Sequence, residues 1–141
     1  MSDKFMFSTE LDVLIGDINY GGHKGNERFF ITFQEARLRY LKQFGYSELS
    51  VGNGAGIIMS QAHINYRAEA FWGDRLKVFV RISKLEKVRF MFEYQIIDAH
   101  NDEKLIATGY TEMVSFDFKN RKVKKLPDKF ISDIKKYEEL E

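Results

Sequence analysis

The chain has 141 residues, the size of one ordinary domain, and its formal net charge is only +1. A charge so close to zero gives no electrostatic preference for nucleic acid, and a charged fraction of 30% is typical of a soluble surface. The absence of cysteine excludes disulfides, a thiolate nucleophile and zinc–thiolate sites, and it favours a reducing, cytoplasmic location.

Aromatic residues make up 15% of the chain, which is high for its size, so we expect some of them to line a ligand cavity or a subunit interface. Residues 1–4 and those after them mix polar with apolar side chains, which is unlike a signal peptide. No apolar run approaches the roughly 18 residues of a membrane-spanning helix, and we expect no membrane partner. The only proline, Pro127, lies near the end, so we expect one domain over residues 1–141.

The first half of the chain predicts a strand, a loop and a long helix. Phe5 to Ile15 alternates loosely between apolar and polar residues, as a strand does, and the glycines between Gly16 and Gly25 indicate a loop. From Asn26 to Phe44 apolar residues recur at spacings of three and four, which predicts one buried helix face. Asn26 stands where an N-cap belongs, and Gly45 stands where a C-cap glycine belongs.

The second half of the chain predicts strands and a short closing helix. The strands cover Gly56 to Ala68, Arg75 to Glu86, Arg89 to Asp98 and Lys104 to Asp117, and a charged helix follows from Phe130 to Leu140. One long helix with a five-stranded antiparallel sheet is an α+β arrangement. The helix can cover one face of a curved sheet, and pairing with another copy is the simplest protection for what remains.

Residues 16–30 resemble the signature of the 4-hydroxybenzoyl-CoA thioesterase-like hotdog family. That signature is roughly Asp-x-Asp, two or three linking residues, Gly-His-Val-Asn-Asn and an aromatic residue, and the helix after it often reads Phe-Glu-Glu-Ala-Arg. Residues 33–37 match this helix start, residues 65–76 look like the family's Asp-Tyr-x-x-Pro-x-x-x-Gly-Asp-x-Leu segment, and residues 107–109 look like its last strand. The resemblance extends over about residues 8–127.

The resemblance implies a hotdog fold, in which a curved sheet wraps around one long central helix. It also implies homodimers or homotetramers with active sites at the subunit interface. The implied substrate is a thioester, usually an acyl-CoA and sometimes an acyl-carrier protein, and no metal or separate cofactor is needed because CoA is part of the substrate. The expected activity is therefore that of an acyl-CoA thioesterase.

An important departure from the family concerns the catalytic acid. The second acid of Asp-x-Asp commonly serves there as nucleophile or base, and this chain has Asn19 in its place while it keeps Asp17. An amide neither accepts a proton usefully near neutral pH nor attacks a carbonyl as a carboxylate does. Two alternatives therefore stay open: a non-catalytic hotdog module that binds acyl thioesters, and an acyl-carrier-protein thioesterase.

The loop before the long helix holds the first catalytic candidates. Hydrolysis needs donors for the developing oxyanion, and the backbone N–H at Asn26 is our candidate, with the loop from Gly22 to Gly25 shaping the approach. His23 is a candidate general base, because the unperturbed pKa of histidine is roughly 6.5. The alternatives are a glycine-rich turn that only starts a helix, and a histidine that only fixes the shape of the loop.

Three further polar residues are candidates for catalysis or positioning. Some hotdog thioesterases use a carboxylate from the central helix as base, which makes Glu35 the leading substitute for the missing acid; alternatively it is a solvated charge paired with Arg39 at i+4. Asp17 can hold His23 or cap the loop. Asn19 can still orient a water molecule or the thioester carbonyl.

The CoA phosphates need cations at the cavity mouth. Lys87 and Arg89 belong to the turn between two predicted strands, where relatives often contact the nucleotide, and Arg67 is a third candidate. Tyr20 is a loop aromatic that can line the pocket. Charges in a hairpin turn are ordinarily just solvated, which is the alternative for Lys87 and Arg89.

Overall fold

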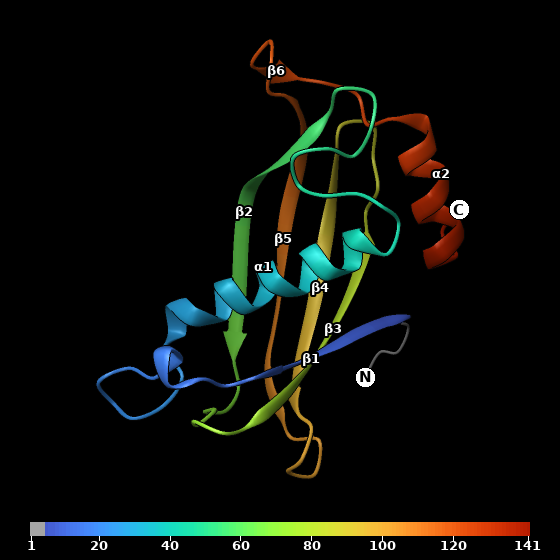
Figure 1. The fold of residues 1–141 in the computed structure, drawn as a ribbon. Coiled ribbons are helices and arrows are strands. Elements are labelled where there is room, and N and C mark those ends of the chain that lie inside the picture. Colours follow the sequence, from blue (N-terminus) through green and yellow to red (C-terminus); the bar gives the residue numbers. More distant parts are fainter. Residues whose placement is uncertain (1–4) are drawn as a thin grey trace.

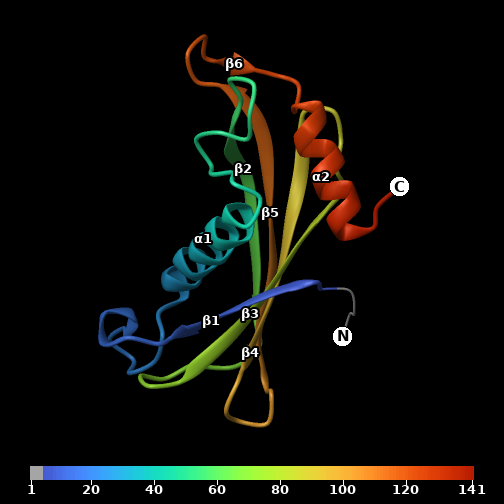
Figure 2. The ribbon, with the colours of Figure 1, turned by 45° about the vertical axis from the view of Figure 1, so that its right-hand side comes forward.

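A curved antiparallel sheet with a long helix across one of its faces forms the body of the molecule (Figures 1 and 2). The computed structural model describes residues 5–141, so residues 1–4, on which part of the signal-peptide prediction depends, lie outside the described part. No helix in that described part is long and apolar enough to cross a membrane. The elements are β1 (Phe7–Asp12), the 3-10 helix η1 (Ile15–Asp17), α1 (Asn26–Lys42), β2 (Gly56–Tyr66), β3 (Arg75–Ser83), β4 (Arg89–Asp98), β5 (Leu105–Asp117), β6 (Lys122–Val123) and α2 (Asp128–Glu138).

The strands are arranged in the order β1-β3-β4-β5-β2, and every neighbouring pair is antiparallel. The two-residue strand β6 pairs with the end of β5 and was not predicted. The α+β hotdog architecture predicted from the sequence is confirmed. Strand β3 buries every second residue, as expected for a sheet with one face covered by a helix.

Helix α1 packs on the sheet through side chains spaced three and four residues apart: Phe29, Thr32, Phe33, Ala36, Arg37, Tyr40 and Leu41. The ring of Phe33 stacks on that of Tyr94 in β4, with centroids 4.0 Å apart. A Cβ at Gly109 in β5 would lie 2.8 Å from the Phe33 ring and 2.4 Å from the carbonyl oxygen of His63. Glycine at this position therefore allows α1 and β2 to approach β5 closely.

Both ends of α1 differ by one or two residues from the prediction. The N-cap is Gly25 and not Asn26, because the Gly25 carbonyl accepts the first helical hydrogen bond, from the backbone N–H of Arg28 at 2.9 Å. At the other end the C-cap is Gln43, and Gly45 follows two residues later with a left-handed φ of 84°. Asn26 is thus the first residue of the helix, and a glycine without a capping side chain precedes it.

The two edges of the sheet are treated differently. Strand β1 pairs with β3 only as far as Val80, and beyond it the carboxylate of Glu138 in α2 accepts the backbone N–H of Ile82 at 3.1 Å. The outer edge of β2 has no strand partner within residues 5–141, and residues 58–63 of this strand are exposed. An exposed edge of this length is ready to pair with another chain.

Candidate active site

The loop before α1 folds back on itself and is held by backbone hydrogen bonds. The backbone N–H of Asn19 donates to the carbonyl of His23 at 2.9 Å, and that of Gly22 donates to the carbonyl of Asn19 at 3.0 Å. Gly22 has a φ of 87°, a conformation that side chains rarely adopt. The N–H of Gly25 then donates to the carbonyl of Asp17 at 2.9 Å, so the loop closes where the helix begins.

Asn19 serves as a turn residue within this loop. Its side-chain oxygen accepts the backbone N–H of Gly21 at 2.8 Å, which is an Asx-type turn. Asp17 acts in a similar way at the preceding 3-10 helix, where its carboxylate accepts the N–H of Leu14 at 2.9 Å. Both side chains therefore shape the loop, and their predicted roles toward a substrate stay predictions.

His23 is half-buried and has a polar neighbour beside each ring nitrogen. Its Nδ1 lies 3.1 Å from the carbonyl oxygen of Lys24, and its Nε2 lies 3.5 Å from a carboxylate oxygen of Glu69. A hydrogen on Nδ1 donates to that carbonyl and leaves the lone pair on Nε2, where a proton can be accepted beside a negative charge. Glu69 was not predicted, since only the fold brings the segment after β2 next to residue 23.

The first turn of α1 lies beside His23. The backbone N–H groups of Asn26 and Glu27 have no hydrogen-bond acceptor among residues 5–141, and they carry the positive end of the helix dipole. The Tyr66 hydroxyl at the end of β2 donates to the carbonyl of Asn26 at 2.9 Å. A hollow of about 320 Å³ opens here, lined by His23, Lys24, Asn26, Phe29, Tyr66, Arg67, Ala68 and Glu69. Three predicted site residues, His23, Asn26 and Arg67, thus come together; we call this space the His23 hollow.

A buried lysine separates the His23 hollow from a second one. The side chain of Lys24 is 4% exposed, and its Nζ lies 3.6 Å from the Asp17 carboxylate and 5.3 Å from the centre of the Phe29 ring. Burial lowers the pKa of Lys24, although the charge of Asp17 opposes this effect. Sequence reasoning did not single out Lys24, because lysine in a glycine-rich loop usually indicates a solvated charge.

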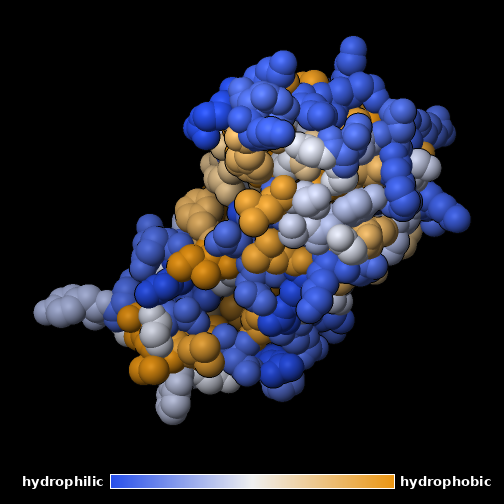
Figure 3. Space-filling model, turned by 45° about the horizontal axis from the view of Figure 1, so that its top comes forward, coloured by the Kyte–Doolittle hydropathy of each residue, from blue (hydrophilic) through white to orange (hydrophobic). Residues whose placement is uncertain are grey.

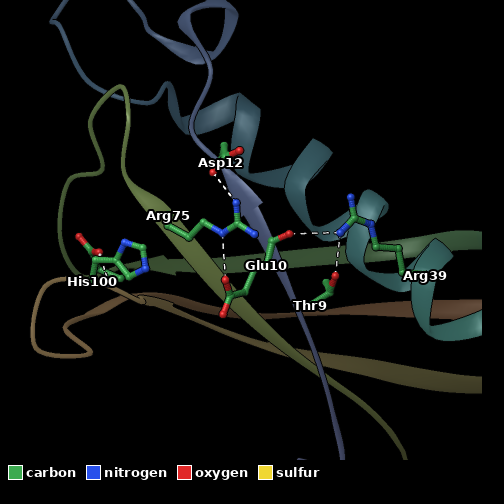
Figure 4. Close-up of polar contacts among 7 residues, drawn as sticks. Thr9, Glu10, Asp12, Arg39, Arg75 and His100 are labelled. Carbon is green, nitrogen blue, oxygen red and sulfur yellow. Dashed lines mark hydrogen bonds and ion pairs between the residues drawn. The ribbon is translucent and has the colours of Figure 1, made fainter.

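Glu35 lies in the second hollow and not in the first. This space of about 390 Å³ is lined by Glu10, Leu11, Asp12, Leu14, Asp17, Lys24, Ile31, Thr32, Glu35 and Arg39. The Glu35 carboxylate accepts a hydrogen bond from the Arg39 Nε at 2.9 Å, so the i,i+4 pair predicted as the alternative is present. Arg39 itself reaches β1, where it donates to the Thr9 hydroxyl at 2.7 Å and to the backbone of Glu10 (Figure 4). A base role for Glu35 is left without support from this geometry.

The remaining predicted residues lie outside both hollows. Tyr20 is fully exposed. Arg89 pairs in register with Val114 of β5, whereas Tyr66 at the His23 hollow pairs with Ala107. At about 3.3 Å per residue, these two points of β5 are roughly 23 Å apart. Lys87 and Arg89 are therefore at the opposite end of the sheet from His23 within one chain.

A further hollow of about 530 Å³ contains none of the predicted catalytic residues. It lies among side chains of β3, β4 and β5 that alternate with the core residues and so face away from α1, including Arg81, Glu93 and Tyr110. His23, Glu69 and the first residue of α1 instead meet at the smaller His23 hollow. Within residues 5–141, no group of three His, Cys, Asp or Glu side chains could hold a metal ion.

Comparison with known proteins places this fold and loop among relatives. The profile of the thioesterase-like superfamily matches residues 13–134. A comparison with curated proteins gave no match. A 1,4-dihydroxy-2-naphthoyl-CoA thioesterase from Synechocystis is 28% identical, with a TM-score of 0.81, and the alignment covers 91% of this chain and 94% of that one.

Two solved structures from Staphylococcus aureus share the fold at lower identity. A DHNA-CoA thioesterase is 22% identical with a TM-score of 0.79, and the match covers 92% of this chain and 86% of that one. A hypothetical protein in complex with CoA is 20% identical with a TM-score of 0.86, and the match covers 99% of this chain and 87% of that one.

Proposed function

Because the chain belongs to the thioesterase-like superfamily, we propose that it hydrolyses acyl-CoA thioesters to a carboxylic acid and free CoA in the His23 hollow. The observation that carries this proposal is that a histidine beside a carboxylate meets the open N–H group of Asn26, the first residue of α1, in one hollow. The first is suited to activating water, and the second is suited to receiving an oxyanion.

The proposed reaction uses His23 first as a base and then as an acid. The thioester oxygen accepts the N–H groups of Asn26 and Glu27, and the Nε2 of His23 takes a proton from a water molecule whose oxygen bonds to the carbonyl carbon. Glu69 stabilises the imidazolium that forms. The tetrahedral intermediate then collapses, the carbon–sulfur bond breaks, and the departing thiolate takes the proton from His23. These reaction steps need no carboxylate at position 19.

CoA is the proposed carrier. The Synechocystis relative, which is 28% identical, is named for a CoA thioester. Arg67 lines the His23 hollow and offers a cation for phosphate or carboxylate groups. An acyl-carrier-protein thioesterase is the second candidate within the same chemistry. Comparing hydrolysis of one acyl group on the two carriers separates them.

A homodimer is the proposed assembly, formed by antiparallel pairing of two β2 edges. Antiparallel pairing places the Gly56 end of one strand beside the Tyr66 end of the other. The turn with Lys87 and Arg89 in a second copy then approaches the His23 hollow of the first, which returns these cations to the predicted nucleotide role. Figure 3 shows hydrophobic side chains exposed across the middle and lower left of one face. The exposed large apolar side chains of the protein include Phe30 in α1 and Ile58, Met59 and Tyr66 in β2.

Sedimentation analysis across a concentration series tests this assembly and distinguishes a dimer from a tetramer. A protein that stays monomeric at all concentrations would contradict it. The proposed site of action is the cytoplasm, which the cysteine-free composition supports.

The activity is tested by a hydrolysis screen across short, long and aromatic acyl-CoAs, with release of the CoA thiol as the signal. We expect His23→Ala to lower kcat by about 10² or more, because it removes the general base. The matched control is His100→Ala, since His100 is an exposed histidine in the turn between β4 and β5.

An inert wild type across the panel would instead favour the non-catalytic module, for which Asn19 is the supporting observation. Asn19→Asp then gives the decisive comparison. Activity gained by this variant in an inert parent would mean that the chain has lost catalysis and kept only the binding site.

A further inference from the structure

Lys24 is a buried cation that the proposed reaction does not use. Its backbone N–H donates to the carbonyl of Ala70 at 2.7 Å, and its side chain is enclosed between Asp17 and the Phe29 ring. Removing an ammonium group from water is costly, and an apolar side chain of similar length would fill the space without that cost.

Lys24 lies at the boundary between the two hollows, and its counterion lies on one side of it. Lys24 lines both hollows, whereas its counterion Asp17 lines only the second hollow. The carboxylate of Asp17 is also fixed on its own side by the N–H of Leu14. The ammonium group of Lys24 therefore has Asp17, in the wall of the second hollow, on one side and Phe29, in the wall of the His23 hollow, on the other.

The positive end of this pair lies beside the first turns of α1. The Nζ of Lys24 is 5.3 Å from the ring centre of Phe29, and Phe29 lines the His23 hollow together with Asn26. Arg28, the other cation near Lys24, also belongs to the first turn. A fixed charge in a water-poor wall acts on a developing anion more strongly than the same charge in solvent.

We infer that Lys24 contributes to this site: its charge, held between the Asp17 carboxylate and the Phe29 wall of the His23 hollow, favours the oxyanion that forms at the start of α1. The inference rests on the proposed thioester hydrolysis and adds a residue to it. Lys24 stabilises the transition state more than the bound substrate, because the thioester oxygen gains its charge only during the reaction. The expected signature is a loss in kcat with little change in KM.

The test uses three substitutions that separate charge from hydrogen bonding. Lys24→Gln keeps a donor for Asp17 and removes the charge, Lys24→Met removes both, and Lys24→Arg keeps the charge. We expect the two neutral variants to lose at least tenfold in kcat with KM within threefold, and Lys24→Arg to stay well above them. The matched control is Lys77→Gln, which removes a cation 5.2 Å from the Phe79 ring in β3 and should leave kcat unchanged.

Thermal unfolding of each variant verifies that the comparison is made on folded protein. A folded Lys24→Gln protein with the kcat of the wild type overturns the inference and leaves the proposed function intact. A folded Lys24→Arg protein as slow as Lys24→Gln also overturns it, because charge would then not be the property required. A wild type that hydrolyses no acyl thioester removes the proposed function itself, and the inference falls with it.

Discussion

The first turn of α1 and its last turns are packed in opposite ways. At the start, Asn26 is exposed, the N–H groups of Asn26 and Glu27 are open, and the helix faces a hollow. At the other end, Tyr40 is fully buried, and its ring contacts the rings of Phe7, Phe44, Phe92 and Tyr137. The Tyr40 hydroxyl also donates to the carboxylate of Glu138 in α2.

The difference shows how one helix can serve both stability and a site. A helix start with unpaired donors and no capping side chain contributes little to its own stability. The aromatic cluster at the other end, together with α2, holds the helix on the sheet, so the first turn can remain open without the helix detaching. We therefore expect substitutions at the two ends to have separable effects on unfolding and on catalysis.

The largest effect is expected from Tyr40→Ala, which should lower the free energy of unfolding by about 3–5 kcal/mol, since it leaves a cavity in the aromatic cluster. Urea denaturation measures this loss. Tyr40→Phe is the matched control and should lose only about 1–2 kcal/mol, because it removes just the hydroxyl that donates to Glu138. Below the unfolding transition, kcat should be unchanged in Tyr40→Phe; a large fall there would mean that the two ends are coupled.

Next in size is Glu69→Gln, which should lower kcat roughly tenfold, about 1.4 kcal/mol, by removing the charge that stabilises protonated His23. The Glu69 side chain is 61% exposed, so its loss should leave the melting temperature unchanged. Steady-state kinetics with matched melting curves tests both halves. Glu103→Gln, an exposed glutamate in the turn between β4 and β5, is the comparison variant.

A smaller, pH-dependent effect is expected at Glu138. Burial raises the pKa of Glu138 above its ordinary 4.5, although the Tyr40 hydroxyl and the N–H of Ile82 oppose the shift. A raised folded-state pKa contributes stability that is fully present below the unfolded value and is lost as pH rises through the folded value. The Glu138→Gln side chain stays neutral, so the melting temperature of this variant should exceed that of the wild type by a growing margin as pH rises from about 4.5 to 7. Parallel melting curves over that range would contradict this assignment.

The smallest effect is expected from Glu35→Gln. Its carboxylate is 49% exposed and paired with Arg39, and an exposed i,i+4 pair is worth roughly 0.3–0.5 kcal/mol. We expect kcat within threefold of the wild type and a barely altered melting temperature. A fall in kcat comparable to that of His23→Ala would restore Glu35 as the base and displace His23 from that role.

Much of the fold could be predicted because its signals are local. The spacing of Phe33, Ala36 and Tyr40 and the alternation in β3 and β4 follow from backbone periodicity. The helix ends were harder to predict. Asn26 and Gly25 are adjacent, and Gly25 is the N-cap because its carbonyl accepts the first helical hydrogen bond. The strand β6 carries too few residues for a periodic signal.

The candidate site could be predicted only in part. His23 and Asn26 are neighbours in sequence, so the loop motif pointed to both. Glu69 and Arg67 join them only because β2 runs back past the start of α1, as the bond from Tyr66 to Asn26 records. Glu35 was expected because some hotdog thioesterases use a carboxylate of the central helix, and the i,i+4 pair with Arg39, which the sequence predicted as the alternative, is present.

The sequence by itself determined the classes of element, their order and the glycine-rich turn, because these depend on side-chain periodicity and on backbone conformations that few residues other than glycine adopt. Only the tertiary structure decided which charged side chains line which hollow. Lys24 and Asp17 are seven positions apart in the chain, but the packing of the helix and loops around them decides which hollow each side chain lines. Burial and orientation are properties of the packed chain, and they give the same residue types different roles.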